Sequence, residues 1–392
     1  MKFLHIADLH IGKCLNQKSL LEDQKIILDQ IVKYMEDYNV DVLMLAGDIY
    51  DKQIPSKEAV NLFNDFLCDL ILKHHNKVYI TSGNHDSTER LNFASSILKN
   101  EGLYFETYAN VPISKYEFHD EFGKVNLYML PYSSPLYTRV KFDSTCNNYS
   151  EMIMYYVENS NFDFSKRNIL LTHHTFLHNN MASFSDSEVR FNIGGTEGID
   201  AAYFKDFDYV ALGHLHNPQY VNRHHIRYSG SILKYSDSEV NINKVALMVE
   251  LKEKGNIEIT ELPLTPLHDL KKIKGTIDEL LVNPDVLDED YVYVTLTNDT
   301  IIPYAMKRIR VKYPNALSQT YERLSKQQID KTIDTTDFKE KSIKDQFKEF
   351  YKFINNKELS DNQKSILDKI LEKVDEEKWD QLNLQWMLVV LF

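Results

Sequence analysis

The sequence is poor in cysteine, in positive charge and in long apolar runs, and each shortage excludes a class of protein. Its three cysteines, Cys14, Cys68 and Cys146, form no CxxC pair and cannot all be bridged. That favours a reducing compartment over a disulfide-linked secreted fold. The most apolar terminal run, residues 382–392, is about half as long as a membrane helix. Residues 1–10 contain histidine and aspartate and do not resemble a signal peptide, so we expect a cytoplasmic protein.

The balance of charge is acidic, with a net charge of −13. This weighs against a protein that coats duplex DNA by itself, because phosphate binding needs a locally cationic surface. It leaves open an enzyme that meets phosphate through metal ions. The 392 residues, 43% apolar and 26% charged, are typical of a soluble globular chain of two or three domains.

The pattern along the chain predicts three regions. Residues 1–265 alternate short apolar runs with amphipathic stretches, which is typical of an α/β domain. Residues 266–325 follow two prolines and contain a strand and a basic helix, which predicts a small cap domain. Residues 326–392 are charged and helical, and they end in the apolar tail 379–392, to which the pattern assigns no role.

Two predicted helical segments matter for partners. In the segment 55–74, five apolar residues share one helical face: Val60, Phe63, Leu67, Leu70 and Ile71. In the segment 337–376, two amphipathic helices follow one another, and Ser360 and Gln363 have the spacing of a capping box at the start of the second. The pair is either a small bundle of its own or a hairpin that binds a partner.

Five apolar runs each end in aspartate, asparagine or histidine. The residues are Asp8 and His10; Asp48 and Asp51; Asn84, His85 and Asp86; His173 and His174; and His214 and His216. Ligands of α/β sheets collect outside the carboxyl ends of strands, so these ends can converge. Taken singly, each motif is more often a turn or a surface residue. Burying so many polar groups together is costly unless a cation compensates, and the set therefore predicts a metal site.

The ligand types narrow the choice of ion. Oxygen donors combined with several imidazoles suit Mn, Fe or Zn better than Mg or Ca. Seven ligands are too many for one tetrahedral ion and enough for two ions that share a carboxylate. Two divalent ions held by two aspartates would keep a charge of about +2, which attracts phosphate and favours hydroxide formation from a bound water.

His85 follows a predicted ligand and can therefore face the leaving group of a bound phosphate ester. There it could protonate a leaving alkoxide or stabilise developing charge. Asp51 is the candidate that orients its imidazole. The alternative is that His85 is a further ligand of the second ion.

The motifs DLH, GDIYD, GNHD, THH and GHLH, in that order, resemble the signature of calcineurin-like metallophosphoesterases. Longer segments at 47–59, 83–98, 228–239 and 263–281 closely resemble the SbcD family, the nuclease subunits of bacterial SbcCD complexes. The resemblance runs from residue 1 to about 375. It implies a four-layer α/β/β/α sandwich with a small α+β cap domain and a C-terminal helical hairpin.

The resemblance also implies a ligand set and a catalytic residue. Asp8, His10, Asp48 and His216 would hold one manganese ion, and Asp48, Asn84, His173 and His214 the other, with His85 catalytic. Magnesium is a possible substitute in an assay, and no organic cofactor is expected. Because His174 adjoins the ligand position, the choice of His173 rests on the motif and not on chemistry.

The family's activity would be Mn-dependent hydrolysis of DNA phosphodiesters, as a 3′–5′ exonuclease on duplex ends and an endonuclease on hairpins and single strands. It serves DNA recombination, replication and repair together with SbcC, a coiled-coil ATPase. We predict that 337–376 binds SbcC and that helices at 56–73 and 88–99 form a homodimer.

The predicted basic helix could contact DNA. If the cap lies across the mouth of the metal site, Lys307, Arg308, Arg310 and Lys312 would touch phosphates; a solvated helix face is the alternative. Two other functions remain open from the residues alone. One is a phosphoesterase that acts on nucleotides or phosphoproteins, and the other is a non-catalytic scaffold.

Overall fold

The computed structural model divides the chain into two compact units, residues 1–322 and 323–392. We describe each unit by itself. The residues that the structure describes are 1–177, 182–188, 198–282, 289–322, 344–345, 347–348, 351–352 and 357–371.

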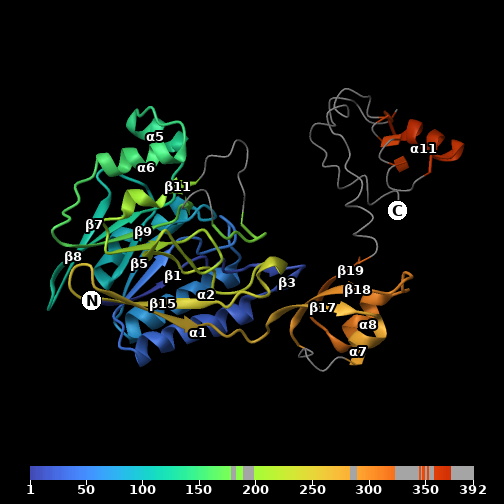
Figure 1. Cartoon of the computed structure of the whole chain (residues 1–392), viewed down its shortest axis with the longest axis horizontal. Helices are drawn as coiled ribbons and strands as arrows, with labels where there is room; N and C mark the ends of the chain where they lie inside the picture. The colour runs from blue at the N-terminus through green and yellow to red at the C-terminus, as the bar shows by residue number, and fades with distance from the viewer. Residues whose placement is uncertain are drawn as a thin grey trace. The chain divides into compact units, whose positions relative to one another are not determined.

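Two six-stranded mixed sheets form the centre of the first unit (Figure 1). In spatial order the first contains β16 (Ile257–Pro263), β15 (Val245–Leu251), β1 (Lys2–Ile6), β4 (Val42–Ala46), β5 (Lys77–Thr81) and β6 (Leu103–Glu106). The second contains β13 (Gln219–Val221), β14 (Arg223–Tyr228), β12 (Tyr209–Leu212), β9 (Arg167–Thr172), β8 (Gly123–Leu130) and β7 (Ser114–Asp120). The inner strands of each sheet are parallel, so their carboxyl ends share an edge.

Strands β4 and β9 are buried along their whole length because both faces of each sheet are covered. Met44 of β4 and Leu171 of β9 belong to the apolar cluster between the two sheets. Leu43 and Leu45 belong instead to the cluster that the outer helices cover. The alternation of side chains along one strand therefore joins two separate cores.

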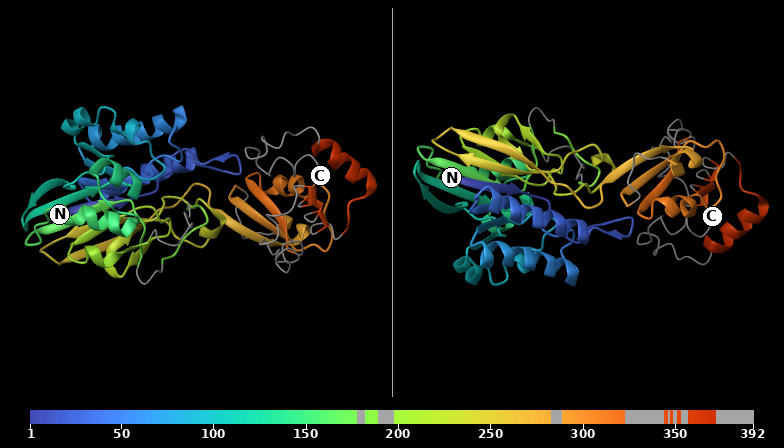
Figure 2. Two further views of the ribbon diagram at one scale, coloured as in Figure 1. Left: turned by 90° about the horizontal axis from the view of Figure 1, so that it is seen from above. Right: turned by 90° about the horizontal axis from the view of Figure 1, so that it is seen from below.

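Helices cover the outer face of each sheet. On the first sheet these are α1 (Leu21–Asp37), α2 (Lys57–Cys68), which continues as a π-helical turn (Asp69–Lys73), α3 (Thr88–Asn92) and α4 (Ser95–Leu98). On the second they are α5 (Pro135–Phe142) and α6 (Tyr149–Glu158). The two sheets lie between these helical layers (Figures 1 and 2), which confirms the predicted α/β/β/α sandwich.

Several short elements complete the sandwich. They are β2 (Cys14–Leu15), β3 (Lys18–Ser19), β10 (Phe176–Leu177), β11 (Ile199–Asp200) and the 3-10 turns Lys99–Glu101, Ala201–Phe204 and Asp237–Glu239. Strands β2 and β3 form a hairpin whose turn residues, Asn16 and Gln17, both have positive φ. Within the described part of the chain, no helix has the length and apolar character needed to cross a membrane.

The predicted strand and basic helix of the cap are both present. The cap consists of β17 (Leu270–Gly275), α7 (Ile277–Val282), β18 (Tyr291–Leu296), α8 (Ala305–Lys312) and β19 (Ala316–Tyr321). All three strands are parallel and alternate with helices that pack on one sheet face. The implied α+β cap is therefore corrected to a βαβαβ unit, because parallel neighbours need crossover connections.

The predicted apolar face of helix 55–74 is only partly buried. Ser56 caps α2 by accepting a hydrogen bond from the Ala59 amide. Phe63 and Leu70 are buried, but Val60 is exposed. The apolar face is therefore covered at Phe63 and Leu70 and open to solvent at Val60.

In the second unit the structure describes α11 (Asp361–Leu371). The Ser360 amide donates to Gln363 Oε1 over 3.0 Å, and the Gln363 amide donates to Ser360 Oγ over 3.4 Å. This confirms the predicted capping box. Most of the predicted helix before it, and the apolar tail, lie outside the described residues.

Candidate metal centre

The loops after five parallel strands bring the predicted ligands together. Asp8 and His10 follow β1, Asp48 follows β4, and Asn84 follows β5 in the first sheet. His173 follows β9, and His214 and His216 follow β12 in the second. The side chains meet where the carboxyl ends of the two sheets adjoin, as expected for a ligand site in an α/β protein.

One group of close ligand atoms consists of Asp8, His10 and His216. The Nε2 atoms of His10 and His216 are 3.1 Å apart, and His10 Nε2 lies 3.7 Å from Asp48 Oδ2. Two facing ring nitrogens repel each other unless a proton or a metal ion lies between them. His10 Nδ1 is also buried without a hydrogen-bond partner among the described residues.

A second group consists of Asp8, Asp48 and His173, with Asn84 and His214 beside it. His173 Nε2 is 3.3 Å from Asp48 Oδ2 and 3.1 Å from Asn84 Oδ1. Asn84 Oδ1 is also 3.0 Å from His214 Nδ1. Asp48 thus contacts a histidine of each group, which is the position that a shared ligand needs.

His174 points away from both groups, although it is equally buried. Its Nε2 accepts a hydrogen bond of 3.2 Å from the Ser133 amide, and its Nδ1 is 3.0 Å from Thr172 Oγ1. Its ring stacks on Tyr132. Geometry therefore distinguishes two neighbouring histidines that residue type alone could not.

The electrostatics of these groups favour metal binding. Burial lowers the pKa of His10 and His216 below the ordinary value, and lowers that of His214 to about 3. These rings are therefore neutral at pH 7, which is the form that coordinates a metal. Burial lowers the pKa of His173 as well, but the negative charge of Asp48 outweighs it and raises that pKa to about 9. A bound cation would replace this proton.

The backbone around the site is strained. Asp8, His10, Asp48 and His214 have φ values of 53°, 42°, 51° and 94°, all in the left-handed region. Such residues persist only where their surroundings hold them, and they concentrate at functional sites. At Gly213 even a methyl group would collide with the Ala46 carbonyl and the His173 ring, so close packing demands glycine there.

Asp86 is a functional residue that the sequence reasoning named without a role. Its carboxylate accepts hydrogen bonds from the amides of Ile49 (3.0 Å), Tyr50 (3.2 Å) and Gly83 (2.9 Å). It therefore ties the loop after β4 to the loop after β5, and so holds Asp48 beside Asn84. Burial, with the nearby charge of Asp48, raises the pKa of Asp86 to about 6.

A polar network that the sequence reasoning missed supports His216. Ser187 Oγ lies 2.6 Å from His216 Nδ1 and donates to Glu239 Oε1, also over 2.6 Å. Lys244 binds Glu239 Oε2 over 2.6 Å and donates to the His216 carbonyl over 2.9 Å. A carboxylate that fixes the tautomer of a ligating histidine is a common support for a metal site.

His85 lies at the edge of the cluster. Its amide donates to Asp48 Oδ1 over 2.9 Å, and its ring meets the His10 ring edge-on at 4.9 Å. Its Nδ1 is 3.1 Å from the main-chain carbonyl oxygen of Asp51. The Asp51 carboxylate instead forms an ion pair of 2.7 Å with Lys13. The contact expected of the Asp51 side chain is thus made by its backbone.

Comparisons with known proteins agree with this site. A family model described as calcineurin-like phosphoesterase matches residues 1–218, and one described as type 5 capsule protein repressor C-terminal domain (SbcD_C) matches 266–354. A Staphylococcus epidermidis protein, named as the SbcD subunit of the SbcCD nuclease, is 35% identical over 384 residues, which are 95% of this chain and 100% of the relative. The chain belongs to the SbcD family of calcineurin-like phosphoesterases. This confirms the predicted family.

Two solved structures match the chain at much lower identity. GAP50, the anchor in the inner membrane complex of Plasmodium, is 12% identical over 68% of this chain and 89% of its own, with a TM-score of 0.39. A dimetal phosphatase from Danio rerio is 11% identical over 68% of this chain and 99% of its own, with a TM-score of 0.36.

Membership of the SbcD family makes the chain a metal-dependent hydrolase of the nuclease class. The predicted enzyme class is thereby confirmed. The clustered aspartates and histidines fit the divalent metal ions that a phosphoesterase of this family uses.

The predicted DNA-contact residues lie on α8 of the cap, and none belongs to the cluster. Arg308 pairs with Asp278 at 3.1 Å, and Arg310 donates to the Ala316 carbonyl over 3.2 Å. Lys312 lies over the Tyr313 ring, and Lys307 is exposed. Three of the four basic side chains of this helix therefore make contacts within the cap.

The two adjacent histidines provide a matched test of the ligand set. We expect His173→Gln to lower the manganese content from two ions per chain to one, because His173 contacts Asp48 and Asn84. His174→Gln should keep both ions, since the hydrogen bonds of its ring among the described residues go to Ser133 and Thr172 and not to a ligand. Elemental analysis of dialysed protein would measure this. Loss of metal from the His174 variant alone would contradict the geometry.

Proposed function

We propose that this chain is the Mn-dependent nuclease subunit of an SbcCD-type complex, cleaving DNA phosphodiesters with two metal ions. The observation that supports the proposal best is the two buried ligand groups, with Asp48 close to a histidine of each and His85 at their edge. No predicted ligand is absent from the cluster. That argues against a scaffold that has lost activity.

The ligand sets of the two ions follow from the two groups. Asp8, His10, Asp48 and His216 would hold one ion. Asp48, Asn84, His173 and His214 would hold the other. Mixed imidazole and oxygen donors suit manganese. When bound, two such ions polarise a phosphate and lower the pKa of a coordinated water.

The chain's own contribution to bond cleavage would come from His85. Its Nδ1–H donates to the Asp51 carbonyl, which fixes the orientation of the ring. The Nε2 atom makes no hydrogen bond among the described residues, so it is available to substrate. In the imidazolium form, Nε2 would give its proton to the oxygen that leaves phosphorus, while the attacking water bonds to phosphorus and releases a proton to solvent.

His85→Asn tests this role directly. We expect cleavage to fall about 10²- to 10⁴-fold, the usual contribution of a positioned general acid. The manganese content should not change if the two proposed ligand sets hold; a loss of metal would instead assign an ion to the group of His10, Asp51 and His85, whose ligand atoms also lie within 4.8 Å of one another. Short single-stranded and hairpin DNA, assayed with Mn and with Mg, would serve as substrates.

The control for this variant is His224→Asn, which changes an exposed histidine away from the cluster. It should cleave like the unmodified protein. A His85 variant with unchanged rates would move the proton transfer to another residue. Turnover of mononucleotides or phosphopeptides without turnover of DNA would favour a different phosphoesterase activity.

The proposed partner is SbcC, the ATPase of the complex named in the S. epidermidis relative. The proposed binding segment is 337–376, of which the structure describes α11 and a few preceding residues. In α11, Ile366 is exposed while Leu367 is buried. An exposed apolar residue beside a charged face is typical of a helix that binds a groove.

Removal of residues 330–392 tests this assignment. We expect the shortened chain to lose co-purification with SbcC and to keep Mn-dependent cleavage of short single strands, because every metal ligand lies before residue 217. Pull-down with tagged SbcC would measure the first and gel electrophoresis the second. Co-purification at the level of the full chain would refute the assignment.

A homodimer through the helices at 56–73 and 88–99 is also proposed. These segments carry large apolar side chains in contact with solvent: Val60 on α2, Phe93 after α3 and Ile97 on α4, the last two being 81% and 70% exposed. Apolar groups exposed in this way often mark a subunit contact.

The double variant Phe93→Glu with Ile97→Glu should shift the chain from dimer to monomer in sedimentation velocity, because it places charge on that surface. The control is Val140→Glu on α5, a site that is 80% exposed. This control should leave the dimer intact. A double variant that sediments as a dimer would place the contact elsewhere.

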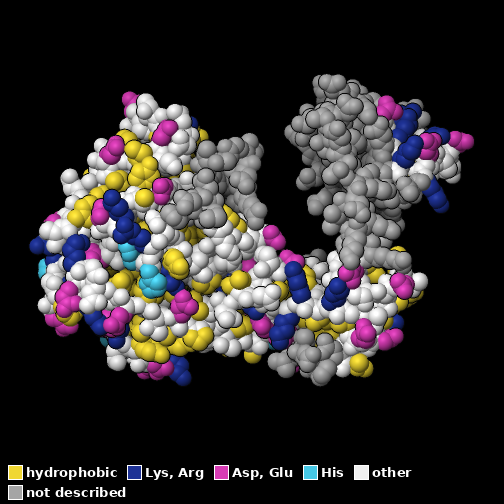
Figure 3. Space-filling model, viewed as in Figure 1, with side chains coloured by type: hydrophobic (Ala, Val, Ile, Leu, Met, Phe, Trp, Pro, Cys, Tyr) yellow, Lys and Arg dark blue, Asp and Glu magenta, His cyan; other side chains and the backbone are white. Residues whose placement is uncertain are grey.

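Binding of DNA by this chain is proposed to be weak and salt-sensitive. On the face that Figure 3 shows, basic and acidic side chains of the described residues are interspersed, with no continuous basic surface. Lys307, Arg308, Arg310 and Lys312 would add phosphate contacts from the cap. We place the chain in the cytoplasm, where its three free cysteines would stay reduced.

A further inference from the structure

Two segments of the sandwich contact the cap with one residue and the metal-site loop with the next. The first is Asp23–Gln24 at the start of α1, and the second is Lys234–Tyr235, which follows β14. We call residues 7–13, which follow β1 and contain Asp8 and His10, the β1 loop. These paired contacts connect the cap to the β1 loop, so a movement of one can affect the other.

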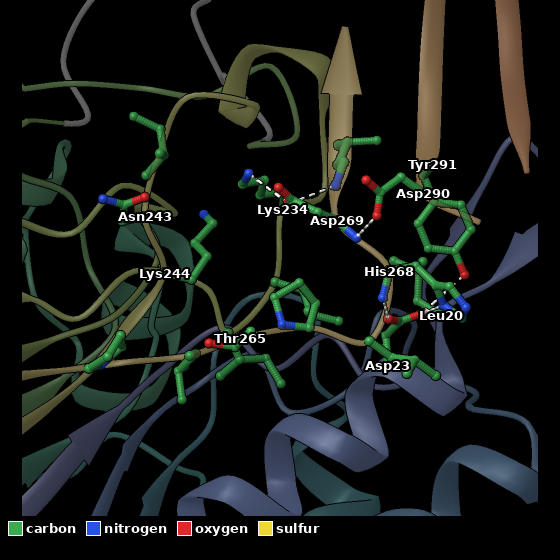
Figure 4. Close-up of a pocket in the computed structure, with 18 of the residues that line it drawn as sticks. Leu20, Asp23, Lys234, Asn243, Lys244, Thr265, His268, Asp269, Asp290 and Tyr291 are labelled. Atoms are coloured by element: carbon green, nitrogen blue, oxygen red, sulfur yellow. Dashed lines mark hydrogen bonds and ion pairs between the residues drawn. The ribbon is translucent and has the colours of Figure 1, made fainter. Parts of the chain in front are cut away.

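On the cap side, the contacts are made by buried or partly buried ionic groups. Asp23, only 1% exposed, accepts hydrogen bonds from the His268 amide (2.8 Å), His268 Nδ1 (3.2 Å) and the Tyr291 hydroxyl (3.0 Å). Lys234 forms an ion pair of 2.7 Å with Asp269. Asp269 in turn receives the Tyr291 amide on its carbonyl. Both tethers therefore end on the start of β18 (Figure 4).

On the metal side, the second residue of each pair, Gln24 or Tyr235, forms hydrogen bonds with the β1 loop. Gln24 is fully buried; its Oε1 accepts the Gly12 amide over 3.0 Å, and its Nε2 donates to the His10 carbonyl over 2.8 Å. The Tyr235 hydroxyl donates to the Leu9 carbonyl. The same hydroxyl accepts from Gln24 Nε2 over 3.1 Å, so the two residues act together.

Tyr235 also touches the ligands themselves. Its ring packs edge-on against the His10 ring at 5.5 Å and against the His216 ring at 5.9 Å. Four residues after Tyr235, Glu239 supports His216 through Ser187. Between them, Asp237 forms an ion pair of 2.8 Å with Lys272 of β17. This short segment thus contacts the cap and the metal site alternately.

The β1 loop reaches the cap a third way, through the hairpin of β2 and β3 that continues from it. Asn16 Nδ2 donates to the Leu317 carbonyl over 3.3 Å, and Lys18 Nζ lies 3.4 Å from Asn315 Oδ1. The hairpin is only a few residues from His10 along the chain. A displacement of the cap would therefore act on this loop through Gln24 and Tyr235 and also through the hairpin that follows it.

The joint between the cap and the sandwich is not closely packed throughout. A cavity of about 630 Å³ lies at it, lined by Leu20, Asp23, Lys234, Lys244 and His268 among others (Figure 4). Leu270, Tyr291 and Leu317 supply the apolar contact of the cap with the sandwich core. Because the cavity leaves space beside these polar tethers, a small shift of the cap can change them while Leu270, Tyr291 and Leu317 keep their apolar contact.

We propose that the position of the cap sets the position of the β1 loop, and through it the affinity of the site for manganese. Gln24 and Tyr235 are the positioning residues, and Asp23 and Lys234 are the tethers to the cap. The strained conformations of Asp8 and His10 persist only while their surroundings hold them, so weaker contacts free the loop. Coupling of this kind is reciprocal, so manganese must also steady the cap. The inference rests on the metal site of the proposed function.

The test changes a cap residue and measures metal binding. Tyr291→Phe removes one hydrogen bond to Asp23 and changes no residue of the sandwich itself. We expect it to weaken manganese binding about three- to tenfold in titration calorimetry of the full chain. The matched control is Tyr313→Phe, which removes a hydroxyl that donates to the Leu280 carbonyl inside the cap. The control should bind manganese like the unmodified protein.

Hydrogen exchange gives the reverse measurement. In the unmodified protein, manganese should slow amide exchange at residues 268–270 and 291–293. Tyr235→Phe removes the hydroxyl that joins Gln24 to the Leu9 carbonyl and keeps the ring, and it should abolish most of this slowing.

The outcomes separate the coupling from the proposed function. If the unmodified protein binds no manganese, the proposed function itself fails. If it binds manganese but Tyr291→Phe binds equally well, the coupling is overturned. It is also overturned if Tyr313→Phe loses as much affinity, because the effect would then reflect general destabilisation of the cap.

Discussion

The cost of burying charged and polar side chains without water is the constraint on which the site depends. Two carboxylates, an amide and four imidazoles of the predicted ligand set meet in one cluster that is almost wholly buried. Isolated in an apolar interior, such groups would lose several kcal/mol each in hydration. Divalent cations remove this penalty, because they bind the lone pairs that otherwise face one another, as between His10 and His216 at 3.1 Å. Burial accordingly keeps His10, His214 and His216 neutral, whereas the charge of Asp48 keeps a proton on His173 until a cation replaces it.

The fold of the sandwich brings the ligands close enough together to share bound cations, as this constraint requires. Parallel inner strands in both sheets deliver their carboxyl ends to one place, and the apolar cluster between the sheets fixes the distance between the two sets of loops. The loops then adopt left-handed conformations that cost free energy and are held by Asp86, Gln24 and Tyr235. The packed layers of the sandwich therefore hold the loops, and with them the ligand side chains, in fixed positions.

The sequence predicted the site better than it predicted what supports the site. Strand-terminal Asp, Asn and His residues stand out by type and spacing, and the family resemblance then indicated which seven of them would be ligands. Supporting contacts are different, because many use the main chain. The Asp51 carbonyl contacts His85, and no side-chain pattern reveals it. Ser187 and Glu239 are 52 residues apart and meet only through the tertiary fold. The capping box at Ser360 was predictable because both partners lie within one helical turn.

Ion pairs in the cap also affect how strongly this acidic chain attracts DNA. Several cations of the cap already form ion pairs: Lys271 with Asp290, Lys272 with Asp237, Lys274 with Glu322 and Arg308 with Asp278. Paired charges attract a polyanion only weakly at a distance, so they contribute little to the counterion release that drives DNA binding. Attraction for phosphate must then come mainly from the metal centre and from a partner.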